Sequence, residues 1–402
     1  MPSRVTAPSD TTLDAVLRRD LSVLDRADLR RETHPVHGRR GAAVSADGRP
    51  AIDFSSNDYL GLAGDPRIAD TIAVALRREG TGAAAARLIS GTNDLHEELE
   101  TALAQFKGTA AALLFASGYA ANTGAIPALA SRGDVIYADA LNHASLIDGC
   151  RLSRADVKIF PHLDLDRLDD LLRDDAEHNG RRWIVVDAVF SMDGDLFPLD
   201  ELVALAREHG AFTYVDDAHG TGVLGDNGRG SAEHWHVEQQ IDVNMGTLGK
   251  AIGTTGAFIA GSQALRDWLL NRARAFVFTT ATPPALAAGT LAALRIAASE
   301  PWRREQLRAN ARAIREGLHA LGREPSGESD GHIIPVRIGE AADTARLGAA
   351  LRARGILVGA VRPPTVPLGS SRVRITASAA HTPEQIAQLL HALRDLLPSA
   401  AA

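Results

Sequence analysis

Hydrophobic residues recur along the chain with two different spacings, which predict where the strands and helices lie. Between residues 110 and 262, short runs that are apolar throughout alternate with longer segments of helical spacing. The apolar runs predict strands at 111–115, 134–138, 157–160, 183–189, 212–215, 243–246 and 257–260. The segments between them predict helices at 120–129, 144–153, 165–178 and 199–209. This alternation is typical of a mostly parallel sheet that is covered on both faces.

The same spacings predict the elements on either side of this region. Before it, we expect helices at 12–31, 66–80 and 95–106, and a short strand that runs into a polar turn over 51–62. After it, we expect strands at 332–338 and 373–377 and helices at 263–275, 285–321, 342–354 and 383–396. The second of these helices has a possible break near Pro301. The predicted organisation is a helical arm at 1–52, a large α/β domain at 53–290 and a smaller C-terminal α+β domain at 291–402.

Composition and charge narrow the class of protein. The chain has 402 residues, of which 45% are hydrophobic and 23% charged, with a net charge of -7. This charge gives no reason to expect nucleic acid or an anionic membrane as a partner. No apolar run approaches the roughly 18 residues that span a bilayer, and residues 1–20 lack the apolar centre of a secretory signal. The single cysteine, Cys150, excludes an internal disulfide and fits a reducing compartment, so we expect the cytoplasm.

The segment after the predicted strand 243–246 carries a lysine in an unusual setting. Lys250 follows Gly249 and precedes Gly253. Glycines let the backbone bend sharply and let a ligand come close. A lysine amine in such a place could form a Schiff base with a carbonyl cofactor, although an ordinary loop lysine is the alternative from this segment alone.

A second segment strengthens the cofactor hypothesis. Asp216, Asp217 and His219 follow directly after the apolar strand 212–215, where carboxylates are expensive to bury without a positive partner. A protonated pyridine nitrogen is such a partner, and the protonated ring stabilises a carbanion. A divalent metal is the competing explanation. We favour the cofactor, and expect no metal site, because no further clustered metal ligands appear and Lys250 follows another strand.

Three weaker candidates also follow predicted strands, where ligands bind in open α/β sheets. The Ser117-Gly118 turn opens a helix and could bind a phosphate, although many α/β turns look alike. His143 could cap a helix or face a cofactor. The turn containing Ser191 could offer a hydroxyl or could be an ordinary solvated turn.

Taken together, these segments resemble the α-oxoamine synthases. The matching segments are 55–62 (SSNDYLGL), 117–122 (SGYAAN), 143–146 (HASL), 190–194 (FSMDG), 216–222 (DDAHGTG) and 247–250 (TLGK). Members of this family are fold type I enzymes that use pyridoxal 5'-phosphate. They condense an amino acid with an acyl thioester and release carbon dioxide. The resemblance therefore implies this fold, this cofactor and these two substrates.

The resemblance also implies roles for individual residues. Lys250 would hold the cofactor as a Schiff base and later take the α-proton, Asp216 would pair with the ring nitrogen, and His143 would stack on the ring. The remaining cofactor contacts would be made by Ser117, Gly118, Tyr119, Ser191, His219, Thr247 and Thr280. Of these, Thr280 would reach the partner's phosphate, because the family's active sites lie at a homodimer interface. Arg374 would hold the amino acid carboxylate. The other substrate contacts would be Arg31, Asn57, His143, Arg362 and Thr365, with Arg31 and Thr365 at the acyl group.

Two segments bear on the substrate. Residues 361–367 (VRPPTVP) and 371–374 (SRVR) are most similar to the branch that joins alanine to a pimeloyl thioester, on coenzyme A or a carrier protein, in biotin biosynthesis. Residues 87–92 (RLISGT) are equally similar to glycine-using members of the family, such as 2-amino-3-ketobutyrate coenzyme A ligase. A non-catalytic partner subunit of the same fold is a further alternative, but such subunits usually lack the lysine.

Overall fold

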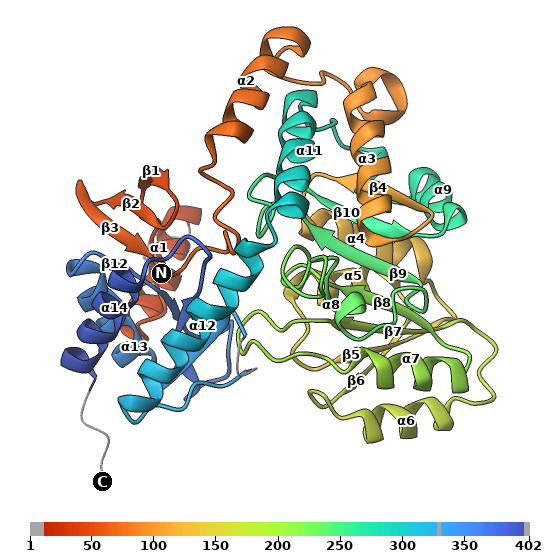
Figure 1. Ribbon diagram of the computed structural model, residues 1–402. Helices are drawn as coiled ribbons and strands as arrows, with labels where there is room; N and C mark the ends of the chain where they lie inside the picture. Colours follow the sequence, from red (N-terminus) through yellow and green to blue (C-terminus); the bar gives the residue numbers. More distant parts are fainter. Residues whose placement is uncertain (1–11, 328–330, 398–402) are drawn as a thin grey trace, which may run out of the picture.

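The seven strands predicted between residues 110 and 262 form one sheet in the computed structural model, which describes residues 12–327 and 331–397 (Figure 1). They are β4 (Ala111–Phe115), β5 (Val135–Asp139), β6 (Asp156–Phe160), β7 (Arg182–Asp187), β8 (Phe212–Asp216), β9 (Val243–Thr247) and β10 (Ala257–Gly261). Their order is β4-β10-β9-β8-β7-β5-β6. Only β10 runs antiparallel to its neighbours, so the prediction of a mostly parallel sheet is confirmed.

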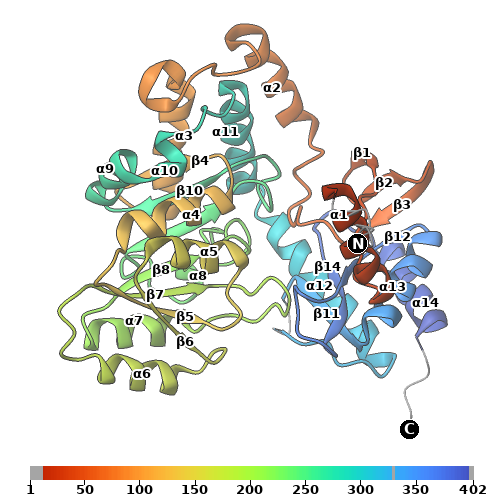
Figure 2. The same ribbon diagram turned by 180° about the vertical axis from the view of Figure 1, so that it is seen from behind.

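Helices cover both faces of this sheet. One face packs against α4 (Gly118–Leu129), α5 (Ala144–Ser153), α9 (Gln263–Arg272) and α10 (Arg274–Val277), which lie in front in Figure 2. The other face packs against α3 (Asp94–Lys107), α6 (Leu165–Asp174), α7 (Leu199–Glu208), α8 (Ser231–His234) and α11 (Pro284–Ser299). The edge strand β6 is the exception to the expected burial, since its Ile159 is 67% exposed.

Two smaller sheets are built from the two ends of the described chain. The first has the order β1-β2-β3-β12, with β1 at Val36–Arg40, β2 at Ala43–Ala46, β3 at Arg49–Asp53 and β12 at Ile356–Leu357. The second has the order β11-β14-β13, with β11 at Ile333–Gly339, β14 at Ser371–Thr376 and β13 at Gly359–Val361. Because β3 pairs with β12, the N-terminal segment lies beside the C-terminal one (Figure 1). The division at residues 52 and 290 stays a prediction.

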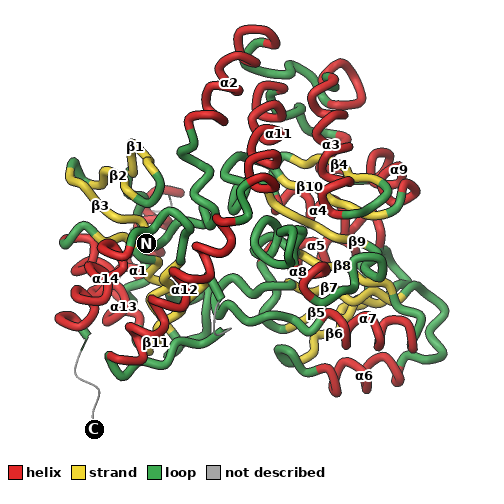
Figure 3. The backbone as a smooth tube through the Cα atoms, viewed as in Figure 1, coloured by secondary structure: helices red, strands yellow, loops and turns green. Residues whose placement is uncertain are grey.

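The predicted helices outside the large sheet are mostly present (Figure 3). The structure contains α2 (Pro66–Glu79), α13 (Ala341–Ala353) and α14 (Pro383–Leu396), and α11 is separated from α12 (Trp302–Ala320) at the predicted break near Pro301. One prediction was wrong in its extent: α1 spans Leu13–Arg26 and ends before Arg30 and Arg31. The short helical turn η1 (Arg87–Gly91) and the strands β1, β2, β12 and β13 were not predicted.

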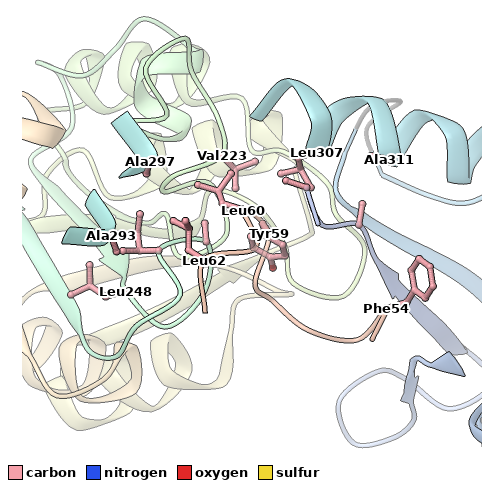
Figure 4. Close-up of a cluster of buried hydrophobic side chains, with 14 of the residues drawn as sticks. Phe54, Tyr59, Leu60, Leu62, Val223, Leu248, Ala293, Ala297, Leu307 and Ala311 are labelled. Carbon is pink, nitrogen blue, oxygen red and sulfur yellow. The ribbon is translucent and has the colours of Figure 1, made fainter. Parts of the chain in front are cut away.

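An apolar cluster fixes the segment 54–62 between the large sheet and α12 (Figure 4). Tyr59, Leu60 and Leu62 are all fully buried in it, together with Leu248, which lies two residues before Lys250. This packing holds a polar turn of the N-terminal half close to the predicted catalytic lysine.

A buried ion pair ties α3 to the loop after β8. The ammonium of Lys107 lies 2.8 Å from a carboxylate oxygen of Asp217, and the two side chains are 2% and 0% exposed. Ser231 also donates to this carboxylate, at 2.6 Å. Gly230 leaves room for the pair, because a Cβ there would come within 1.8 Å of the carboxylate. Asp217 is therefore compensated within the protein and serves its stability.

We expect Lys107→Met to lower the free energy of unfolding by roughly 3–5 kcal/mol, because it leaves a buried carboxylate without its cation. Chemical denaturation of the variant measures the change. Arg18→Ala is the matched control, because the Arg18–Asp14 pair is more than 70% exposed on both sides and its loss should leave stability unchanged. A Lys107→Met protein as stable as the parent would contradict the stabilising role of the pair.

Candidate active site

The predicted site residues gather at one edge of the large sheet. Strands β4, β5, β7, β8 and β9 run in one direction, so their carboxyl ends meet at the same edge. Asp187 and Asp216 are the last residues of two neighbouring strands and lie side by side in register. Thr247 ends β9, and the turns after β4 and β5 carry Ser117 and His143.

Lys250 is half-buried beside polar side chains. Its amine is 2.9 Å from Nε2 of His219, and Nδ1 of His219 is 2.5 Å from the hydroxyl of Tyr59. Burial of the Lys250 amine lowers its pKa to about 8, although Asp216 and Asp187 act in the opposite direction. Burial also holds the pKa of His219 well below its usual range and raises that of Tyr59 to about 12. With this pKa, roughly a tenth of the Lys250 amine is unprotonated at pH 7, far more than for an ordinary lysine.

Asp216 is buried and has only neutral hydrogen-bond donors. Its carboxylate accepts from the Asn122 amide at 2.7 Å and from the Ala218 N–H at 3.0 Å. Burial raises its pKa, against the favourable charge of Lys250. Among the described residues, none forms an ion pair with Asp216. A protonated ring nitrogen would complete such a site, because buried carboxylates require a positive partner.

Asp187 is a further buried carboxylate that the sequence interpretation missed. It is 3% exposed and accepts a hydrogen bond from the backbone N–H of His143 at 2.6 Å. Burial and the neighbouring charge of Asp216 raise its pKa well above the usual range. The position at the end of an apolar run was visible in the sequence, but Asp187 falls inside the predicted strand 183–189 and was therefore treated as part of it.

The candidate phosphate seat lies where α4 begins. Ser117 caps this helix by accepting from the Ala120 N–H at 3.1 Å, and the first N–H groups of a helix have no acceptor within it. A Cβ on Gly118 would come within 2.9 Å of the Thr247 side chain, so glycine keeps this seat open. The hydroxyl of Tyr119 is bonded to Asp148 and its ring is 48% exposed.

Ser191 lies on a turn at the sheet edge that contacts β14. The Ser191 carbonyl accepts from Nε of Arg374 at 2.6 Å, and Asp193 of the same turn forms an ion pair with Arg372. His162 also anchors the turn, because it lies 3.3 Å from Asp195. In this arrangement, the Ser191 contact with Arg374 is made by its backbone.

Arg374 and Asn57 meet beside the Ser191 turn. Nη1 of Arg374 donates to the Asn57 side chain at 3.2 Å and to the Thr376 hydroxyl at 3.0 Å. The Asn57 oxygen also accepts from Tyr59 at 3.1 Å. These bonds hold a buried guanidinium in place without neutralising its charge, which suits it to binding a carboxylate.

A second group of substrate candidates lies near α1. The Arg31 guanidinium donates to the Thr365 hydroxyl at 3.0 Å, across 334 residues of sequence. Arg362 donates to the backbone carbonyls of Asp28 and Arg30. The structure thus brings Arg31, Thr365 and Arg362 together. Thr280 lies apart from them, exposed at the surface and paired through its backbone with Ala86.

The metal interpretation of residues 216–219 has no support in this geometry. Asp217 is engaged by Lys107 and Ser231, away from the partners of Asp216 and His219. Across residues 12–327 and 331–397, no three His, Cys, Asp or Glu side chains are grouped so that they could hold a metal ion. The two adjacent aspartates therefore have separate partners and separate roles.

Comparison with known proteins gives consistent matches. The model of the family "Aminotransferase class I and II" matches residues 49–393. A protein from Geobacter metallireducens named 8-amino-7-oxononanoate synthase is 48% identical over 371 residues, which are 92% of this chain and 94% of the relative.

Solved structures agree with this result. A serine palmitoyltransferase variant from S. paucimobilis with a bound PLP–myriocin aldimine has a TM-score of 0.90 at 32% identity, with 95% and 96% of the two chains covered. An 8-amino-7-oxononanoate synthase from Francisella tularensis has a TM-score of 0.74 at 29% identity, with 86% and 97% covered.

We expect the reaction of Lys250 with an aldehyde to depend on pH. Because its pKa is lowered to about 8, the rate of modification by pyridoxal phosphate should rise with pH and level off above about 8. The cofactor-free protein is incubated with pyridoxal phosphate at each pH, and borohydride then reduces the imine that has formed. Peptide mass analysis measures the modified fraction. Lys250→Arg is the control that should lose this modification. A rate that still rises at pH 10 would mean that the amine has an ordinary lysine pKa.

Proposed function

The chain belongs to the aminotransferase class I and II family, and we propose that it acts as an 8-amino-7-oxononanoate synthase. Its fold is that of the fold type I PLP-dependent transferases, and its cofactor is pyridoxal 5'-phosphate. The reaction joins L-alanine to a pimeloyl thioester, with loss of carbon dioxide, in biotin biosynthesis. The observation that carries the proposal is the convergence of Lys250, Asp216 and Arg374 on one sheet edge, in a chain with closely similar synthases.

The residues at the sheet edge fit the cofactor. Bound pyridoxal phosphate supplies an electron sink for negative charge on the α-carbon of the amino acid. The uncompensated carboxylate of Asp216 would hold a proton on the ring nitrogen. Ser117, Gly118, Tyr119 and Thr247 would surround the phosphate, where the first N–H groups of α4 are free to donate.

Several side chains would then handle protons and charge during the reaction. The Lys250 amine, whose pKa burial lowers to about 8, would accept the α-proton at Nζ in its unprotonated form. His219 hydrogen-bonds this amine and, with the Ser191 turn, would face the ring oxygen. His143 would cover one face of the ring, and Arg374 with Asn57 would bind the amino acid carboxylate.

The acyl thioester would enter beside α1. Arg31, Thr365 and Arg362 form a polar group there that joins two distant segments of the chain. An arginine guanidinium suits the free carboxylate at the far end of a pimeloyl group. This chemistry favours the dicarboxylate-derived acyl group over the short acyl group of the glycine-using alternative.

We further propose that the enzyme is a homodimer with shared active sites. Apolar side chains near the site edge are exposed in the single chain, where patches of this kind mark interfaces. They are Leu88, Ile89, Leu141 and Phe278, with exposures of 46%, 80%, 44% and 71%. Thr280 lies beside them through its pairing with Ala86 and would contact the phosphate in the partner's site.

Two further aspects of the proposal concern catalysis and location. A non-catalytic partner subunit would not need Lys250, Asp216 and His219, and here all three are present with their hydrogen-bond partners.

Among the described helices, none is both long and apolar enough to cross a bilayer. We propose that the enzyme works in the cytoplasm, where its buried, unpaired Cys150 would stay reduced.

We expect mass spectrometry to detect 8-amino-7-oxononanoate when the holoenzyme is given L-alanine and pimeloyl-coenzyme A. Parallel reactions with glycine and serine, and with acetyl-coenzyme A, test the alternatives. Lys250→Ala should lower kcat by at least about 10³-fold, because it removes both the covalent anchor and the base. Product from glycine and acetyl-coenzyme A, with none from alanine, would instead favour the glycine-using function.

We expect subunits with different inactive sites to restore activity when they are mixed. Lys250→Ala removes the lysine, and Thr280→Glu places a negative charge where Thr280 would meet the partner's phosphate. If the site is shared, unfolding and refolding the two together should give about a quarter of the parent activity, since half of the dimers are mixed and each then has one intact site. No recovery from a mixture that forms dimers would show that Thr280 serves its own subunit.

A further inference from the structure

A buried hydrogen-bond network connects Asp216 to His143. The Asn122 amide nitrogen is 2.7 Å from Asp216 and 2.8 Å from the Ser145 hydroxyl, while the Asn122 oxygen is 2.8 Å from the Tyr214 hydroxyl. The Ser145 hydroxyl is in turn 2.7 Å from Nδ1 of His143. Asn122, Ser145 and Tyr214 are each at most 1% exposed, so water cannot replace these bonds.

Counting donors and acceptors gives this network a direction. An ionised Asp216 can only accept, so Asn122 must turn its amide nitrogen toward it. Tyr214 keeps its proton, because burial raises its pKa well above the usual range, and it donates to the Asn122 oxygen. The second N–H of Asn122 then donates to Ser145. The single hydroxyl hydrogen of Ser145 is left to donate to Nδ1 of His143.

A second observation gives the same assignment for His143. The backbone N–H of Ser145 points at the same Nδ1 atom, at 3.3 Å, because His143 caps the N terminus of α5. A backbone N–H can only donate. Two donors therefore face Nδ1, which must carry a lone pair. His143 keeps an exposed side, but burial of the rest of the residue lowers its pKa and disfavours the doubly protonated ring.

We propose that Asn122 and Ser145 are positioning residues that hold His143 in the tautomer with its proton on Nε2. This inference rests on the proposed function, in which His143 faces the cofactor and substrates. Nε2 then presents an N–H that can donate to a substrate oxygen, either of the amino acid carboxylate or of the thioester carbonyl. The same ring cannot accept a proton there, which leaves Lys250 as the base.

The network also makes the state of His143 depend on that of Asp216. If Asp216 were protonated, it could donate to the oxygen of a reversed Asn122 amide, and the direction of the remaining bonds would change. A protonated ring nitrogen of bound cofactor would keep Asp216 ionised and would so keep the network in the direction described here. Asn122 thereby links the partner of the ring nitrogen to the residue that covers the ring.

The test is the tautomer of His143, read from the 15N shifts of the imidazole nitrogens in histidine-labelled protein. His143→Gln assigns the signal among the 14 histidines. In the parent, with and without pyridoxal phosphate, we expect the proton on Nε2. Ser145→Ala fits the space of serine and removes the shorter bond to Nδ1, at 2.7 Å, so that only the backbone N–H at 3.3 Å still faces this atom. It should therefore raise the Nδ1–H population to a detectable level and lower kcat about tenfold. Ser145→Thr should restore both, because it keeps the hydroxyl.

Ser153→Ala is the matched control. Ser153 is buried at the other end of α5, where it donates to the Cys150 carbonyl outside the network, so its loss should leave the tautomer unchanged. A parent His143 with its proton on Nδ1, or a Ser145→Ala protein with an unchanged tautomer, would overturn the proposal. The measurement needs no substrate, so a failure to form product from alanine would reject the proposed function without deciding the tautomer.

Discussion

The burial of charge at the carboxyl edge of the sheet is the constraint on which the rest of the site depends. Asp187 and Asp216 end neighbouring strands, are each 3% exposed and, among the described residues, have no ion-pair partner. Lys250 is the cation whose charge acts on both, yet burial lowers its pKa to about 8. Neither carboxylate is permanently neutralised, and the lysine is not permanently charged. These charged groups therefore remain available to pair with a cofactor and a substrate. Their burial without partners destabilises the folded state, and packing elsewhere in the fold must offset this.

The adjacent residues Asp216 and Asp217 show how the fold separates stability from chemistry. Asp217 has a buried ammonium at 2.8 Å and hydrogen bonds from Ser231, so its charge is fully compensated. Asp216, one residue earlier, has only an amide and a backbone N–H. The carboxylate of Asp217 is thus held in a fixed ion pair, whereas the carboxylate of Asp216 remains available to pair with a cation. The difference arises from helix α3, because its Lys107 forms an ion pair with Asp217 and not with Asp216.

The sequence allowed the large sheet to be predicted closely, because its strands are short, apolar runs with helices between them. The strand order and the reversal of β10 could not be predicted, since both depend on contacts between runs that look alike in sequence. The strand β1 was missed because its residues, VHGRR, alternate weakly and are mostly exposed. In the site, Lys250 and Asp216 were found from their position after strands. Tyr59 and Asn122 were not assigned roles, because their importance lies in partners 160 and 94 residues away.

The site divides into a rigid part and a part that depends on how distant segments meet. Asp216 ends a strand of one sheet, and Lys250, His143 and Ser117 follow strands of the same sheet, whose hydrogen bonds fix their spacing. Arg374 and Asn57 come instead from β14 and from the segment 54–62, and the Ser191 carbonyl joins the arginine to the large sheet. A small shift of β14 relative to the large sheet would therefore move the Arg374 guanidinium, proposed to bind the substrate, while leaving the groups proposed to bind the cofactor in place.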